Sequence, residues 1–151
     1  MAILFMKQEK LFALLSCYYA LESKLRCYHW NVHGENFVQL HELFEKQYDV
    51  LADEIDAIAE QIRKLGEPVP GNMENYLKAA DKADFDTTNR AEKSQDMLHC
   101  LIEANKQLAE MIVDIKAKFD GDKKYISTCA MMDSLLESRE KDIWFLESCL
   151  K

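Results

Sequence analysis

Apolar residues recur every three or four positions through four long segments of this 151-residue chain, and this spacing constrains its fold more than any other feature. A period of about 3.6 residues is that of an amphipathic helix with one buried face. Only four glycines and two prolines occur, and they fall between these segments. The sequence therefore predicts an all-α chain, and its length predicts a single domain over residues 1–151.

The first two helices have clear predicted ends. The first apolar stripe stops at Gly34, a residue that commonly ends helices. Asn36, followed three residues later by Gln39, predicts a capping box at the start of the second helix. The second stripe stops at Gly66. Two antiparallel helices joined by a short turn are therefore expected.

A connection from about residue 67 to 87 follows, with a short helix expected over Met73–Ala80. The third helix is expected to start at Thr87 or Thr88 and to break at Gly121. Two hairpins joined by one long crossover make a four-helix bundle. The predicted apolar face of the fourth helix is Ile126, Cys129, Met132, Leu136, Ile143, Leu146 and Leu150.

Composition narrows the class of function. The net charge of −8 repels phosphate backbones and favours cations, which argues against general nucleic-acid binding. No stretch approaches the roughly 20 apolar residues of a membrane helix, and the opening apolar run is too short for a signal peptide. The five cysteines are odd in number, lack C-x-x-C spacing, and read as reduced, buried thiols. A cytoplasmic protein is expected.

Three residues around the first break predict half of a metal site. His29 and His41 lie six residues on either side of Glu35, so an antiparallel hairpin brings the two imidazoles to the same level. Glu45 lies one helical turn beyond His41 on the same face. The other histidines carry no such pattern: His33 is expected to be exposed, and His99, three residues after Asp96, to lie on the surface.

A second acidic pair, Asp56 and Glu60, lies further along the same helix with i, i+4 spacing. Asp56 is about 22 Å from His41 at about 1.5 Å per residue, so the two groups cannot bind one ion within a chain. On a helical wheel of about 100° per residue, however, both groups share a flank outside the apolar stripe. That flank also carries Ala52 and Ala59, which are small enough to let another helix approach closely.

We therefore expect two copies of the chain to pack these helices antiparallel across a two-fold axis near Val50 and Leu51. The histidine group and the acidic pair are symmetric about that point, so each group would meet the other one from the second copy. Imidazole and carboxylate ligands together suit iron(II), manganese(II) or zinc. The absence of cysteine ligands indicates an open, reactive site rather than a closed structural one.

The same segment resembles the Dps family, the mini-ferritins. The matching stretches are Y-H-W-N-V-H-G-E-N-F over residues 28–37, L-H-E-L-F-E over 40–45, E-I-D-A-I-A-E over 54–60, and L-G over 65–66. In that family two histidines and an acid come from one subunit, and an Asp and a Glu come from its two-fold mate. The corresponding positions here are His29, His41, Glu45, Asp56 and Glu60.

The resemblance implies a ferritin-like four-helix bundle that assembles into a hollow dodecamer with ferroxidase sites between subunits. Such proteins oxidise iron(II), usually with hydrogen peroxide rather than dioxygen, and store the ferric mineral, which protects the cell from oxidative damage. The family often has tryptophan at the positions of Trp30 and Trp144. We expect Trp30 to lie near the metal site and Trp144 to have a packing role.

This chain departs from the family pattern at two places. Glu45 stands where the family usually has Asp, and is one methylene longer. At the usual acidic position of the iron-entry pore, the chain has Thr128–Cys129–Ala130, with Asp122 and Asp133 as the alternative acids. DNA binding in the family relies on a mobile lysine-rich terminus. None is evident here, so no appreciable DNA binding is expected.

The histidine and acid pattern has two alternative interpretations. Ordinary ferritins place Glu-x-x-His motifs on two helices of one bundle, and none of the four histidines here has Glu three residues before it. That pattern is therefore excluded. The remaining alternative is a shell-forming nucleoid or interaction protein without ferroxidase activity, against which the complete ligand set argues.

Overall fold

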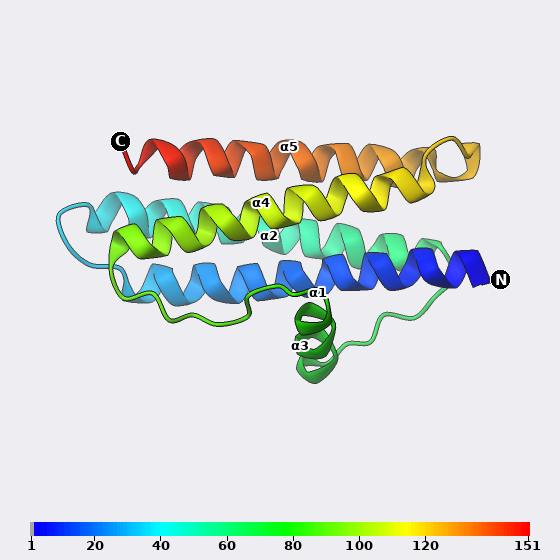
Figure 1. The fold of residues 1–151 in the computed structure, drawn as a ribbon, viewed down its shortest axis with the longest axis horizontal. Coiled ribbons are helices and arrows are strands. Elements are labelled where there is room, and N and C mark those ends of the chain that lie inside the picture. The colour runs from blue at the N-terminus through cyan, green and yellow to red at the C-terminus, as the bar shows by residue number, and fades with distance from the viewer. Residues whose placement is uncertain (1) are drawn as a thin grey trace.

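A computed structural model describes the backbone of residues 2–151 and the side chains of residues 8–151; the side chains of the opening apolar run lie outside the described part. The four long helices lie side by side, and a short helix packs outside them (Figure 1). The predicted all-α four-helix bundle with an extra helix in its crossover is confirmed. No helix among the described residues is long and apolar enough to cross a membrane. The elements are α1 (Ala2–Asn31), α2 (Phe37–Lys64), α3 (Met73–Lys82), α4 (Ser94–Phe119), the 3-10 helix η1 (Lys123–Tyr125) and α5 (Ile126–Ser148).

Two antiparallel hairpins make up the bundle. Figure 1 shows α1 and α2 joined by a tight turn at one end, and α4 and α5 joined at the opposite end. The crossover between α2 and α4 returns along the outside of α1. Each long helix contributes fully buried side chains to one core, for example Tyr18, Leu51, Leu108 and Met132. The apolar faces predicted from helical periodicity for α1, α2 and α4 therefore meet inside the bundle.

The turn between α1 and α2 sets the positions of the histidines. Gly34 has a φ of +106°, in the left-handed region that glycine adopts without strain. The predicted capping box is wrong: Asn36 is the N-cap residue of α2, but its side chain makes no capping hydrogen bond. Backbone bonds close the turn instead, from the Phe37 N–H to the Gly34 carbonyl and from the Leu40 N–H to the Asn36 carbonyl.

The start of the third long helix differs from the prediction. The helix α4 begins at Ser94, and not at Thr87 or Thr88. Lys24, on α1, is almost fully buried and donates hydrogen bonds to the Asp86 carboxylate and to the Thr88 carbonyl oxygen. These long-range bonds hold the end of the crossover against α1. A contact from a distant helix therefore overrides the local capping signal of the threonines.

The buried face of α5 is rotated from the predicted one. Ile126 and Trp144 are exposed, by 66% and 65%, so the expected packing role of Trp144 is wrong within this chain. Met132 and Leu146 are buried as predicted, but Leu135 and not Leu136 faces the core. The centre of this face is a fully buried arginine, Arg139. A prediction from apolar periodicity assigns arginine to the surface, and it therefore misplaces the buried face of α5.

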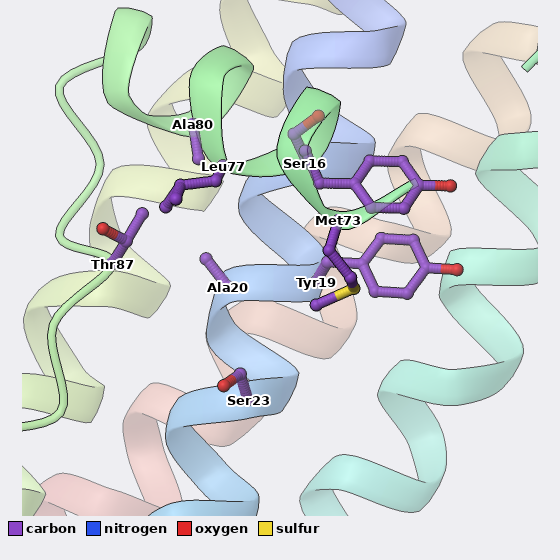
Figure 2. Close-up of a pocket in the computed structure, with 9 residues that line it drawn as sticks. Ser16, Tyr19, Ala20, Ser23, Met73, Leu77, Ala80 and Thr87 are labelled. Carbon is purple, nitrogen blue, oxygen red and sulfur yellow. The ribbon is translucent and has the colours of Figure 1, made fainter. Parts of the chain in front are cut away.

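The short helix α3 packs on α1 as an appendage of the bundle. Its predicted start at Met73 is confirmed, and the Asn72 side chain caps it by accepting a hydrogen bond from the Asn75 N–H. Tyr76 stacks on Tyr19 of α1 with ring centroids 4.3 Å apart. A cavity of about 100 Å³ lies between the two helices and the crossover. Figure 2 shows its lining, which holds only small, apolar and hydroxyl-bearing side chains and therefore offers no strong metal ligand.

Candidate metal centre

The two histidines of the turn hold each other in place. The Nδ1 atom of His29 lies 2.8 Å from the backbone oxygen of His41, and the Nδ1 atom of His41 lies 2.8 Å from the backbone oxygen of His29. The rings stack with centroids 3.7 Å apart. A carbonyl can only accept, so each Nδ1 must carry the proton. The lone pair of each imidazole is therefore on Nε2, free to bind a metal ion.

Glu45 completes a three-residue group on this surface. Ligand atoms of His29, His41 and Glu45 all lie within 4.8 Å of one another, the only such cluster of three or more candidate ligands among the described residues. His29 is buried, His41 is half-buried and Glu45 is exposed. The group is therefore accessible from the surface on the side of Glu45.

Aromatic side chains contact the two imidazole rings. Tyr48 meets His29 edge-on with centroids 5.3 Å apart, and Phe37 lies 5.1 Å from His41. The guanidinium of Arg26 lies 4.1 Å from the centre of the Tyr48 ring. Tyr48 lies two helical turns beyond His41 on one face, a spacing that could have revealed its position. The stack fixes the orientation of both candidate ligands.

Electrostatics around Tyr48 reinforce this arrangement. Burial raises the pKa of Tyr48, and the carboxylates of Glu45 and Asp49 raise it further against the opposing effect of Arg26. The phenol therefore stays neutral at physiological pH. A neutral ring beside His29 leaves the negative charge of this surface on its carboxylates, where it can act on a cation.

Asp56 and Glu60 lie elsewhere on α2 and are both exposed. The structure does not bring them to the histidine group within one chain, as the helical rise predicted. On α2, Val38 shares the flank of these residues and is 56% exposed, whereas Leu51 is fully buried. The flank of α2 thus combines acidic and apolar side chains without a partner inside the described chain.

Other predicted surface residues lie where expected. His33, Asp96 and His99 are all exposed, and none belongs to the ligand cluster. Cys17, Cys27, Cys100 and Cys149 are free thiols, but the predicted burial is correct only for Cys17, because Cys27 and Cys100 are half-buried and Cys149 is exposed. Burial raises the pKa of Cys17 to about 12, which keeps its thiol protonated and unreactive.

The segment compared with an entry pore is partly engaged in structural bonds. Thr128 is buried and accepts a hydrogen bond from Gln61 at 2.8 Å. The Asp122 side chain accepts from the Lys124 N–H at the start of η1, and Asp133 pairs with Lys116 at 2.6 Å. Both alternative acids therefore already serve local structure. Trp30 follows His29 directly and is 69% exposed.

The chain is similar to known proteins over most of its length. The family described as the ferritin-like domain matches residues 8–151. The DNA protection during starvation protein of Porphyromonas gingivalis is 33% identical over 144 residues, which cover 91% of this chain and 82% of that protein. A low temperature-induced protein of Nostoc sp., itself uncharacterised, is 31% identical over 133 residues, covering 88% and 73%.

Solved structures agree closely with the whole fold. The crystal structure of a Dps protein from Bacillus brevis has a TM-score of 0.92 at 25% identity, covering 100% of this chain and 99% of that one. A Dps protein from Vibrio cholerae has a TM-score of 0.90 at 28% identity, covering 99% and 92%. The latter is described as a member of a broad superfamily of ferritin-like diiron-carboxylate proteins.

Proposed function

Since this chain belongs to the Dps family of ferritin-like proteins, we propose that it is a ferroxidase that binds iron(II), oxidises it with hydrogen peroxide and stores the ferric product. The observation that carries the proposal is the convergence of His29, His41 and Glu45, with both Nε2 atoms left free by the reciprocal Nδ1–backbone bonds. Two imidazoles and a carboxylate suit iron(II), which here is the substrate.

The second half of the site comes from another copy. Three ligands on an open surface leave coordination positions vacant, and Asp56 and Glu60 supply two exposed carboxylates on the same helix. Antiparallel packing of two α2 flanks brings each acidic pair to the histidines of the other chain, and it covers the exposed Val38. The two-fold axis passes near Val50, with Leu51 directed into the core of its own chain.

The chemistry follows from this ligand set. Hydrogen peroxide takes up two electrons and two protons to form two waters, so each peroxide oxidises two iron(II) ions. The carboxylates stabilise the higher charge of iron(III) relative to iron(II). Consuming both reactants together prevents the one-electron reaction that releases hydroxyl radical. Two-fold dimers would assemble further into a hollow shell, a dodecamer, that holds the ferric mineral.

A mixing experiment tests whether the site is shared. We expect His41→Ala and Asp56→Asn each to abolish peroxide-dependent iron(II) oxidation, followed by stopped-flow absorbance of iron(III). When the two variants are unfolded together and refolded, random pairing should restore about a quarter of wild-type activity, because mixed dimers hold one intact site of two. His99→Ala, on the exposed face of α4, is the matched control.

Two results would contradict the proposal. Full activity in the single variants would mean that these residues do not bind iron. Loss of activity in each variant without any recovery in the refolded mixture would mean that the site is not shared. A wild-type protein that assembles a shell but does not accelerate iron(II) oxidation would favour the purely structural alternative.

A further inference from the structure

A second group of ligand-type side chains lies inside the bundle, and its centre is an arginine. Arg139 of α5 is fully buried. Its Nη2 atom lies 2.8 Å from Glu54 Oε2, 3.2 Å from Asp142 Oδ2 and 3.1 Å from Ser138 Oγ. Its Nη1 atom donates to Asn105 Oδ1 at 2.8 Å. Oxygen atoms from α2, α4 and α5 therefore converge on one positively charged group.

The side chains around Arg139 are largely buried, and a polar atom beside them lacks a hydrogen-bond partner. The side chains of Glu54 and Asp142 are only 12% and 16% exposed. Gln47 is 4% exposed, its amide group lies beside the Asp142 carboxylate, and its Oε1 atom has no hydrogen-bond partner among the described residues. Burial raises the pKa of Asp142, against the lowering effects of Arg139 and of the nearby Gln47 amide. Gln47 therefore lies beside the cluster as an unused oxygen donor.

The formal charge of the cluster shows what holds it together. Two carboxylates and one guanidinium leave a net charge of −1 in a part of the bundle that is largely shielded from water. Without a cation these two carboxylates would be highly unfavourable in the interior. Carboxylate, amide and hydroxyl oxygens are the donors that hard divalent ions such as manganese(II) and magnesium(II) prefer.

We infer that Arg139 is a built-in cation that occupies a latent divalent-metal site inside the bundle. Its Nη2 group stands where an ion would bind Glu54, Asp142 and Ser138. While the arginine is present, the interior cannot take up a metal ion. The consequence for iron rests on the proposed function: Arg139 acts as a specificity-determining residue that confines iron(II) to the surface group of His29 and His41.

The test removes Arg139 from protein that already lacks the surface histidines. In a His29→Ala/His41→Ala background, the chain with Arg139 should bind no manganese(II), as followed by the EPR signal of the free ion. Adding Arg139→Met should create one site per chain and make thermal stability depend on manganese(II), with a rise of about 5 °C at saturation. Arg139→Lys keeps the charge and should remain without a site.

A neutral variant separates metal binding from packing. Arg139→Met combined with Glu54→Gln and Asp142→Asn removes the buried charges, and should fold without binding manganese(II). If Arg139→Met alone does not fold, manganese(II) should restore its helical circular dichroism, which sodium at equal ionic strength should not do.

The inference is overturned if a folded Arg139→Met protein binds no manganese(II), or if manganese(II) fails to rescue an unfolded one. Binding by the parent that retains Arg139 would also overturn it, provided that Glu54→Gln abolishes that binding. Because every variant lacks His29 and His41, failure here is distinguishable from failure of the proposed surface site.

Discussion

His29 and His41 each donate the Nδ1 proton to the backbone carbonyl of the other, at 2.8 Å in both directions. This reciprocal bond joins the last turn of α1 to the first turns of α2. It selects the tautomer of both rings and leaves both Nε2 atoms free to bind a metal ion. A pair of ligands is thus preorganised by the hairpin before any metal ion arrives.

Tyr48 should orient His29 through packing. Replacing it by leucine removes the edge contact with the His29 ring, and we expect iron(II) affinity to fall about tenfold. Tyr48→Phe retains the ring and should keep wild-type affinity. Anaerobic titration with iron(II) by isothermal calorimetry measures both. Equal affinities for the leucine and phenylalanine variants would show that the ring does not position the ligand.

Glu45 should bind through its charge more than through its length. Glu45→Gln keeps the size of the side chain but removes the negative charge, and should slow iron(II) oxidation by more than about a hundredfold. Glu45→Asp keeps the charge on a shorter side chain, and should stay within about tenfold of wild type. Initial rates of iron(II) oxidation by peroxide, measured for both variants and the wild type, test this prediction. The assignment of Glu45 as a ligand fails if the glutamine variant oxidises iron at the wild-type rate.

Asp86 should make stability depend on pH in the acidic range. Its partial burial acts to raise its pKa, but hydrogen bonds from Thr88 and the charge of Lys24 outweigh this effect, so the pKa is lowered from 3.8. The resulting stabilisation is fully present above pH 3.8 and is lost as pH falls through the lower, folded-state pKa.

Asp86→Asn should therefore lower the unfolding free energy by about 1 kcal/mol at pH 7. The difference in unfolding free energy between Asp86→Asn and the wild type should shrink as pH falls below 3.8. Urea denaturation across this range measures the effect. Asp84→Asn, which alters a neighbouring exposed acid at a φ of +54° that asparagine tolerates, is the control. A constant difference at every pH would contradict the assigned ion pair.

Tyr76 should anchor α3 to the bundle. It is 8% exposed and stacks on Tyr19, so Tyr76→Ala should cost about 2–4 kcal/mol of unfolding free energy and expose the crossover to protease. Leu77→Ala, on the same helix but 52% exposed, should change little. Chemical denaturation and limited proteolysis test this pair. Similar losses in both variants would mean that the aromatic stack is not the anchor.

DNA should not bind this protein at physiological salt. With a net charge of −8 per chain, electrostatic repulsion is multiplied in any oligomer. A gel-shift assay with plain duplex DNA should show no complex at 150 mM salt, whereas a chain extended by several N-terminal lysines should bind. A clear salt-sensitive shift with the unmodified protein would contradict the expectation.

Local patterns in the chain were sufficient for most of the fold. Helical periodicity and glycine positions predicted the long helices, and the equal spacing of His29 and His41 from their turn predicted that the two rings meet. Each of these features depends on residues close together in sequence or related through one turn. Backbone geometry alone converts such spacing into position.

Contacts between distant segments decided the rest. Lys24 holds residues 86–88 against α1, so α4 begins at Ser94 despite the threonines before it. Arg139 is buried because carboxylates from α2 and α5 surround it, and this rotates the face of α5. The sequence alone determined which side chains could bind a metal ion. Only tertiary packing decided which charges are exposed for that role and which neutralise one another inside, because burial of a charge depends on partners that are remote along the chain.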